Sequence, residues 1–475
     1  MRTLRLLLAL APTVAFAQAF DRTQAPALEK PPALKLPALE RASLPNGVTL
    51  QLVQQRELPL VQVTLVIAGG TKLDAKQPGL ASFTTRMLTE GAGTRDANAL
   101  QGELAFLGAQ LFANAGTDAF TISLNVPKRT LGEALDLLGD VVLRPTFRAA
   151  DVRRQRDLRL ASILQRRDNP NVLASLAFSQ LVFPVGHPYH QPTDGDSATT
   201  AALDSAVVRA FYEQTFVPER AKFVVVGDVA LPEMRALLAR RFESWTRGTT
   251  ARTMAAVTAK PVVNTAVKVF LVDKPNAAQS VIFLGAPGAE RLSPDYPALM
   301  VMNTILGGSF SSRLMSNLRE TKGYTYGISS RFAWAPLAGP FTISSGVRTG
   351  VTDSALVEIF KEVKMLRDLP VDAVELERAK AYVALGVPQR FETIGQIAAQ
   401  LVELGTFSLP LASLGDFVAK VNQVTAADVQ RVARQYLPAE TSTLVVVGDV
   451  AKIRPGIEAL KLGAIMTLDV LQVAR

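Results

Sequence analysis

The sequence contains no cysteine and only two histidines among its 475 residues. The absence of cysteine excludes disulfides, thiolate metal sites and cysteine nucleophiles. Both histidines, His187 and His190, lie in one short segment, so a Ser-His-Asp arrangement has few options. Neither a glycine-rich phosphate loop nor a nucleophile elbow occurs. Most routes to catalysis by this chain alone are therefore closed.

Long apolar runs are also scarce, and the one that stands out lies at the start of the chain. Arg2 and Arg5 precede an apolar run from Leu6 to Ala17, and Ala15-Phe16-Ala17 forms a small-x-small cleavage site. We predict a signal peptide over residues 1–17, cleaved after Ala17. The run is shorter than the roughly 20 residues that span a bilayer, so we expect a periplasmic or otherwise exported protein with no stable membrane insertion.

The charge of the chain is moderately basic and not clustered. The formal net charge of +9 falls to +7 once Arg2 and Arg5 leave with the signal, and the basic residues are scattered among acidic ones. No nucleic-acid motif accompanies them, so we expect no nucleic-acid partner. A mixed, solvated surface is the simpler interpretation, and a weak attraction for acidic peptides is the alternative.

An internal repeat determines the predicted architecture. Residues 223–230 (FVVVGDVA) recur 221 positions later as residues 444–451 (LVVVGDVA), each as a buried strand, a glycine turn and an Asp that can cap the next element. Paired apolar runs open each half, at 50–65 and 267–284, and each pair looks like a β-hairpin. Helical periodicity lies between these landmarks, at 131–142, 207–216, 356–366 and 426–436.

These features predict an α+β fold with two homologous α/β half-domains. A proline-rich lead-in occupies residues 18–45, and the first half-domain covers 46–246. Residues 247–263 lack a sustained apolar period and are predicted to be a linker. The second half-domain covers 264–475.

The second half carries a candidate binding pair, Arg319 and Tyr326. A predicted helix over 311–318 ends at Gly323, after which Tyr324, Tyr326 and Ile328 alternate as a strand. Arg319 at the helix end and Tyr326 on the returning strand could face one space, where a guanidinium and a phenol would suit a peptide carbonyl or oxyanion. The simpler interpretation is a surface ion pair and an ordinary strand residue.

Two segments of the first half are further candidates. His187 and His190, with Asp194 or Asp196, could supply three zinc ligands, but the segment has two prolines and no helical frame, so a loop role is favoured. Residues 79–91 are predicted to form an amphipathic helix in which Arg86 and Glu90 are spaced to pair. By itself this helix suggests no chemistry.

In this order, the segments resemble the M16 peptidase family, which includes insulinase and the mitochondrial processing peptidases. The resemblance covers nearly the whole mature chain and implies two similar α+β halves that form half of a clamshell. It is carried by these segments: Asn46-Gly47-Val48, Gly79-Leu80-Ala81, Gly186-His187-Pro188-Tyr189, Phe211-Tyr212, both Val-Gly-Asp turns, and Ser312-Arg313-Leu314 leading into Leu318-Arg319-Glu320.

The sequence has none of the zinc-site residues that active family members carry. Those members carry His-x-x-Glu-His just after the Gly-Leu-Ala, and a further glutamate ligand later in the chain. The matching positions here hold Ser82, Thr85, Arg86 and Ser162. Hydroxyls bind Zn²⁺ poorly and a cation opposes it, so the resemblance implies no zinc in this chain. The family's substrate-binding Arg and Tyr match Arg319 and Tyr326, which are intact.

The resemblance therefore implies a non-catalytic, substrate-binding subunit. A homologous zinc-bearing partner would supply hydrolysis, while Arg319 and Tyr326 of this chain hold the peptide and stabilise the oxyanion. A structural or peptide-holding protein without a proteolytic role is the alternative, and a stand-alone metallopeptidase built on His187 and His190 is a third hypothesis. The sequence does not identify the peptide.

Overall fold

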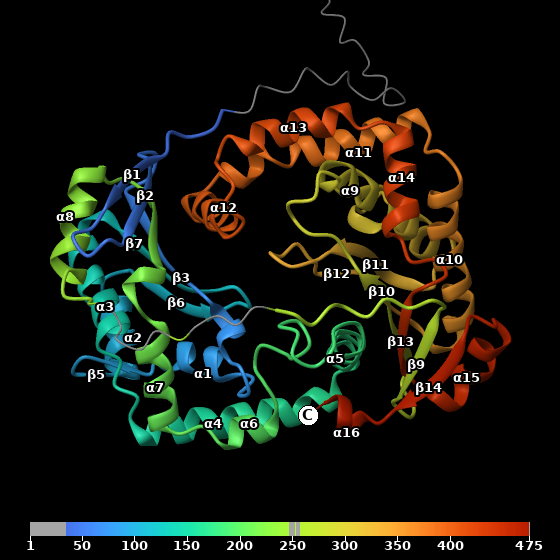
Figure 1. The fold of residues 1–475 in the computed structure, drawn as a ribbon, viewed down its shortest axis with the longest axis horizontal. Coiled ribbons are helices and arrows are strands. Elements are labelled where there is room, and N and C mark those ends of the chain that lie inside the picture. The colour runs from blue at the N-terminus through green and yellow to red at the C-terminus, as the bar shows by residue number, and fades with distance from the viewer. Residues whose placement is uncertain (1–34, 247–251, 253–256, 475) are drawn as a thin grey trace, which may run out of the picture. The chain divides into compact units, whose positions relative to one another are not determined.

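The structure is a computed structural model that describes residues 35–246, 252 and 257–474 (Figure 1). The predicted signal peptide (1–17) lies outside the described residues, as do most of the lead-in (18–45) and part of the linker (247–263). The described strands form two six-stranded sheets, one within residues 40–227 and one within residues 268–468, and a short two-stranded ribbon of β4 (Gly91–Ala92) and β5 (Arg95–Asp96).

The first sheet is built around a strand rich in valine. Its order is β1 (Glu40–Ser43), β2 (Thr49–Gln54), β8 (Ala221–Gly227), β3 (Leu60–Ala68), β7 (Ala119–Pro127) and β6 (Gln110–Ala115). Strand β8 runs parallel to β2 and antiparallel to β3. Most of β8 is buried, as expected for β-branched residues with apolar layers on both faces.

The second sheet repeats this arrangement. Its order is β14 (Ala464–Leu468), β9 (Lys268–Asp273), β13 (Thr443–Gly448), β10 (Gln279–Pro287), β12 (Pro340–Arg348) and β11 (Thr325–Phe332). Strand β13 again runs parallel to one neighbour, β9, and antiparallel to the other, β10. The predicted fold class, two homologous α/β halves, is confirmed; the halves differ at one edge, where β1 is antiparallel to β2 but β14 is parallel to β9.

The predicted β-hairpins at 50–65 and 267–284 are wrong. Strands β2 and β3 do not pair with each other, because β8 lies between them: Val225 is opposite Leu52 on one side and Val63 on the other. Strand β13 separates β9 and β10 in the same way. Two strands separated by one intervening strand lie about 10 Å apart, a distance that residues 55–59 can span. The short connection between β2 and β3 therefore did not imply a hairpin.

The predicted capping role of the two repeated Asp residues is also not observed. Helix α8 (Leu231–Phe242) has Ala230 at its N-cap, and the Asp228 carboxylate instead pairs with Lys128 Nζ at 3.0 Å. Asp449 precedes α15 (Val450–Ala459) but makes no side-chain cap, and its carboxylate accepts from the backbone N–H of Asn276 at 3.1 Å. Asp228 thus ties its turn to a neighbouring segment, whereas Asp449 contacts both a neighbouring segment and, at 2.8 Å, Lys452 Nζ of α15.

Helices cover the sheets and include the four predicted from periodicity. The first half contains α1 (Leu80–Met87), α2 (Ala97–Phe106), α3 (Leu131–Leu143), α4 (Ala149–Gln165), α5 (Pro170–Val182), α6 (Ser197–Ala201), α7 (Ser205–Thr215) and α8. The second contains α9 (Tyr296–Asn303), α10 (Thr352–Asp368), α11 (Ala373–Leu385), α12 (Ile394–Thr406), α13 (Ser413–Gln423), α14 (Ala426–Tyr436), α15 and α16 (Val470–Val473). Within the described residues, no helix is long and apolar enough to cross a membrane.

Two of these helices pack on the sheet of the other half. Ile397, Ala398 and Leu401 of α12 form one buried cluster with Val53 of β2 and with Val224 and Val226 of β8. Helix α5 packs on β13 and β10, in a cluster that includes Leu173, Phe178, Val281, Val445 and Val447. Position 285 requires a glycine, because a Cβ there would overlap the Phe341 carbonyl oxygen of the neighbouring strand and would lie 2.8 Å from the Phe178 ring. Each sheet is therefore completed by a helix from the opposite half.

Candidate functional site

The turn that carries Arg319 is anchored firmly on both sides. It lies in a π-helical segment, Met315–Thr321, that ends at Gly323, whose φ of +62° is the left-handed conformation predicted for a helix-ending glycine. Leu318 is fully buried, and the Tyr324 N–H donates to its carbonyl at 2.9 Å. Arg313, two turns earlier, donates to both carboxylate oxygens of Glu375 on α11 at 2.8 and 2.6 Å. Single π-helical turns of this kind occur frequently at functional sites.

A β-bulge at the start of β11 turns Tyr326 outward. Thr325 pairs with Val347 and Ile328 pairs with Ser345, so the ladder gains an extra residue between them. Tyr326 is 87% exposed while Ile328 is buried. The predicted alternation of Tyr326 and Ile328 on one face is therefore wrong, because a bulge shifts the side-chain period.

Arg319 and Tyr326 meet at this bulge, as the sequence interpretation required. The guanidinium carbon of Arg319 lies 4.9 Å from the centre of the Tyr326 ring and 4.8 Å from that of Phe310, which is 65% exposed. Its Nε contacts Glu320 at 3.2 Å, and its terminal nitrogens have no hydrogen-bond partner among the described residues. These ring contacts leave the terminal N–H groups of the guanidinium available to a carbonyl oxygen.

Helix α1 holds three of the four positions at which the family's zinc motif was matched. Ser82 donates its hydroxyl hydrogen to the Thr193 carbonyl at 2.8 Å, and the buried Thr85 hydroxyl donates to the Ala81 carbonyl at 2.8 Å. Arg86 is exposed and contacts Glu90 at 3.4 Å, which confirms the predicted pair. Each of these side chains therefore already has a partner within the protein.

The fourth position, Ser162, lies on α4, and the same helix brings a cation to α1. Ser162 is exposed, but Arg159, three residues earlier, donates to the Ser82 hydroxyl oxygen at 2.9 Å and to the Gly79 carbonyl at 3.0 Å. The Arg159 guanidinium also lies 5.0 Å from the centre of the Phe83 ring. Two hydroxyls and a fixed guanidinium do not fit a zinc ion, which requires carboxylate, imidazole or thiolate ligands.

The two histidines occupy structural positions in a loop. Backbone N–H of Tyr189 donates to His187 Nδ1 at 3.1 Å, and His190 Nδ1 donates to the Phe183 carbonyl at 2.6 Å. The His187 ring stacks on Phe183 at 4.6 Å, and burial lowers its pKa. In the described part of the chain, no three His, Cys, Asp or Glu residues are grouped to hold a metal, so the hypothesis of a stand-alone site on His187 and His190 finds no support.

The two acidic residues considered with these histidines are committed elsewhere. Asp196 caps α6 by accepting from the Thr199 N–H at 2.7 Å, and Asp194 lies 3.5 Å from Arg166.

A different carboxylate, Asp74, is buried beneath the N-terminus of α1 and accepts from the N–H groups of Gly79 at 2.9 Å and Ala81 at 2.6 Å. Burial raises the Asp74 pKa to about 7, although these two hydrogen bonds oppose the shift.

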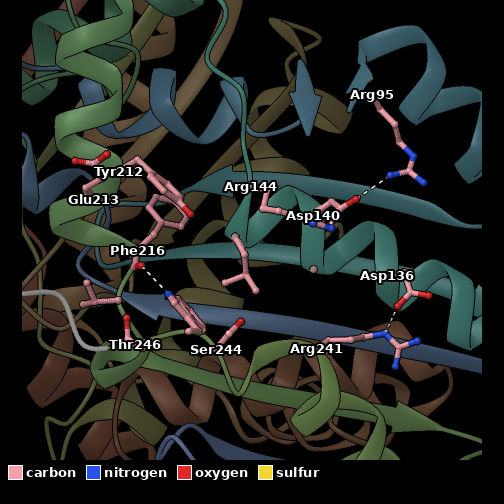
Figure 2. Close-up of a pocket in the computed structure, with 14 residues that line it drawn as sticks. Arg95, Asp136, Asp140, Arg144, Tyr212, Glu213, Phe216, Arg241, Ser244 and Thr246 are labelled. Atoms are coloured by element: carbon pink, nitrogen blue, oxygen red, sulfur yellow. Dashed lines mark hydrogen bonds and ion pairs between the residues drawn. The ribbon is translucent and has the colours of Figure 1, made fainter. Parts of the chain in front are cut away.

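A cavity of about 890 Å³ in the first half contains none of the predicted site residues (Figure 2). Most of its charged groups pair with one another: Arg95 pairs with Asp140 at 2.8 Å and Arg241 with Asp136 at 2.7 Å. The indole N–H of Trp245 donates to the Phe216 carbonyl at 3.0 Å. Because both aspartates that line it already pair with arginines of the same lining, this cavity is a weaker candidate than the Arg319 and Tyr326 pair.

Comparison with known families places both halves in one family. The profile described as insulinase, peptidase family M16, matches residues 52–181, and the profile described as the peptidase M16 inactive domain matches residues 202–383. The chain belongs to the M16 peptidase family.

Curated relatives and solved structures are similar to this M16 chain over most of its length. Uncharacterized zinc proteases of Mycobacterium leprae and Mycobacterium tuberculosis are 25% and 26% identical, over 84% of this chain and 89% and 91% of theirs. The crystal structure of a peptidase M16 inactive domain from Pseudomonas fluorescens is 28% identical, with a TM-score of 0.79 over 86% of this chain and 98% of that one. A protease from Helicobacter pylori shares the fold at 19% identity, with a TM-score of 0.80 over 87% of this chain and 100% of that one.

Sequence reasoning missed two residues of the M16 chain that the structure brings to these sites. Phe310 contacts the Arg319 guanidinium, and the nearby pair Gly307-Gly308, which interrupts the helical pattern of the sequence, was the available signal. Arg159, three residues before Ser162 on α4, contacts α1 through the Ser82 hydroxyl, whereas Ser162 itself is exposed. A cation at that spacing was visible in the sequence.

Proposed function

We propose that this chain is the non-catalytic, substrate-binding subunit of a heterodimeric M16-type zinc metallopeptidase. The observation that carries the proposal is the Arg319 guanidinium, which contacts both Phe310 and Tyr326 while its terminal nitrogens have no partner among the described residues. The donor set at Ser82, Thr85, Arg86 and Ser162, which fits no zinc ion, supports the same division of labour.

In this proposal the chain binds and orients a peptide that another subunit cleaves. A homologous partner, bearing the zinc that activates water, would face the peptide from the opposite side. Arg319 and Tyr326 would donate hydrogen bonds to the carbonyl oxygen next to the scissile bond, and these bonds would strengthen as that oxygen gains negative charge. The predicted signal peptide supports an exported, periplasmic setting for the pair.

The decisive experiment reconstitutes the pair. Peptide hydrolysis should be low for this chain alone and for a zinc-bearing homologue from the same organism alone, and should rise when the two are mixed. Arg319→Ala should lower kcat/KM of the mixture by about 10² to 10³, the usual effect of losing one oxyanion donor. The zinc content of the partner should stay unchanged.

Arg331→Ala is the matched control, because Arg331 is an exposed arginine on the same strand, β11. Its kcat/KM should remain within about twofold of the unmodified pair. An Arg319→Ala mixture as active as the unmodified one would contradict the proposal and would favour a structural or peptide-holding role.

A further inference from the structure

A second cavity, of about 610 Å³, lies where α12 meets the first sheet. Its walls come from the ends of β2, β3 and β8, from the turn that follows β3, from Pro336, and from Gly405 and Thr406 at the end of α12. Neither Arg319 nor Tyr326 lines it. The cavity is therefore a site distinct from the candidate binding pair.

The charged groups of this cavity do not balance. Three cations, Lys72, Arg220 and Lys222, line it with two carboxylates, Asp118 and Glu219. Lys72 forms an ion pair with Asp118, and Glu219 acts electrostatically on Arg220. Among the described residues that line the cavity, cations therefore exceed carboxylates by one, and Lys222 is the cation with no ion pair.

Two nitrogen atoms in the cavity lack acceptors. Nη2 of Arg220 donates to the Arg252 carbonyl, but its Nη1 is buried and has no hydrogen-bond partner. The Lys222 ammonium likewise has no acceptor or carboxylate partner among the residues that the structure describes. Leaving the buried Arg220 Nη1 unpaired costs free energy, so an acceptor that enters the cavity would be stabilised there.

The position of Lys222 follows from the strand that carries it. Val224 and Val226 of β8 pack against α12, and Lys222 lies on the same face two residues earlier. Its Nζ reaches the last turn of α12, where a Cβ on Gly405 would overlap it. Burial lowers the Lys222 pKa, so the charged ammonium is disfavoured at this position. An anion that enters the cavity would offset this penalty.

We propose that this cavity binds a carboxylate of the peptide, with Lys222 and Arg220 Nη1 as its donors. The excess of one positive charge suits a singly charged carboxylate, from either a peptide C-terminus or an acidic side chain, rather than a doubly charged phosphate. The proposal rests on the proposed function in taking a peptide as the ligand. It adds the substrate class, namely peptides that present a carboxylate.

The test measures binding of three fluorescent decapeptides to the full chain by anisotropy. One has a free C-terminus and no acidic residue, the second is the same peptide with an amidated C-terminus, and the third is amidated but contains one internal Glu. The first, the third, or both should bind about 10- to 100-fold more tightly than the second, and the pattern identifies the source of the carboxylate.

Lys222→Met should reduce binding of the preferred peptide to the level of the carboxylate-free one, and Lys222→Arg should restore it. Lys268→Met, at an exposed lysine of β9, is the control and should leave all three affinities unchanged. Equal affinities of the three peptides for the unmodified chain would overturn the proposal. So would a Lys222→Met chain that has a lower Tm but the same peptide affinities, because Lys222 would then serve only the carbonyl end of α12.

Arg319→Ala separates this proposal from the proposed function. If Arg319→Ala weakens all three peptides and Lys222→Met weakens none, the cavity proposal fails and the function stands. If Lys222→Met removes the carboxylate preference and Arg319→Ala changes nothing, the cavity proposal stands and the proposed function fails. Absence of binding by all three peptides would overturn both.

Discussion

The Arg319 guanidinium is positioned by its neighbours while its terminal hydrogen-bond donors remain available. Each exposed cation–π contact, to Phe310 or Tyr326, is worth about 0.5–1 kcal/mol, and the exposed Glu320 contact adds about 0.2–1 kcal/mol. These contacts restrict the rotamers of a long side chain and still leave its in-plane donors free. A lysine in the same place would keep the charge but lose the planar edge that matches a carbonyl or a developing oxyanion.

Asp74 should make the stability of the protein depend on pH. Its pKa is raised to about 7 in the folded state from 3.8, so the folded protein holds a proton that the unfolded chain has already released. The contribution of Asp74 to stability should therefore be greatest below about pH 4 and be lost as the pH rises to about 7, by at most about 4 kcal/mol. Urea unfolding between pH 4 and 8 measures this slope.

Asp74→Asn should flatten the profile, since the amide does not titrate. Its absolute stability should also drop, because an amide cannot accept from both the Gly79 and Ala81 N–H groups as the carboxyl does. Asp136→Asn is the control: the Asp136 side chain is 55% exposed, and the pH profile should keep its slope. Parallel profiles for the unmodified chain and Asp74→Asn would show that Asp74 is not the titrating group.

At the scale of single elements, helices were predictable from the sequence and strand neighbours were not. The predicted helices at 131–142 and 426–436 correspond to α3 and α14 within a residue, because an apolar stripe repeating every 3.6 residues is a local signal. The insertion of β8 between β2 and β3 joins residues far apart in the sequence, and no local pattern encodes it. The bulge beside Tyr326 is intermediate: Gly327 was a local hint, but the register that it breaks depends on β12.

The contact between α1 and α4 makes a prediction about metal binding. A chain carrying Ser82→His, Arg86→His and Ser162→Glu should still bind no stoichiometric zinc, because the Arg159 guanidinium remains within hydrogen-bond reach of position 82. Adding Arg159→Leu removes this cation and should allow about one zinc per chain. The zinc-to-protein ratio after dialysis measures the difference, and a zinc-dependent rise in Tm should accompany it.

Arg153 provides the control for this experiment, since it is an exposed arginine on the same helix. The three substitutions combined with Arg153→Leu should remain without zinc. Stoichiometric zinc in the chain that retains Arg159 would show that the guanidinium does not block the site. The loss of the family's ligands at positions 82, 86 and 162 would then explain the absence of zinc binding on its own.

At the scale of the whole described fold, the exchange of α5 and α12 links the stability of the two halves. Chains of this size commonly unfold domain by domain, because the interfaces between domains are small and polar. Here the buried faces of β8 and β13 are each covered by a helix from the other half. Separating the halves would expose apolar valines on both sheets, so neither sheet keeps a complete core alone.

Leu401→Ala on α12 tests this coupling. Leu401 is 3% exposed in the cluster with Val224 and Val226, so its truncation should cost about 2–5 kcal/mol. Because the two halves share their cores, calorimetry should show one unfolding transition for the unmodified chain and one transition, at lower temperature, for the variant. Leu369→Ala, at a leucine that is 54% exposed, should leave the Tm nearly unchanged. Two resolved transitions, of which Leu401→Ala shifts only the first, would mean that α12 stabilises the first sheet without coupling it to the second.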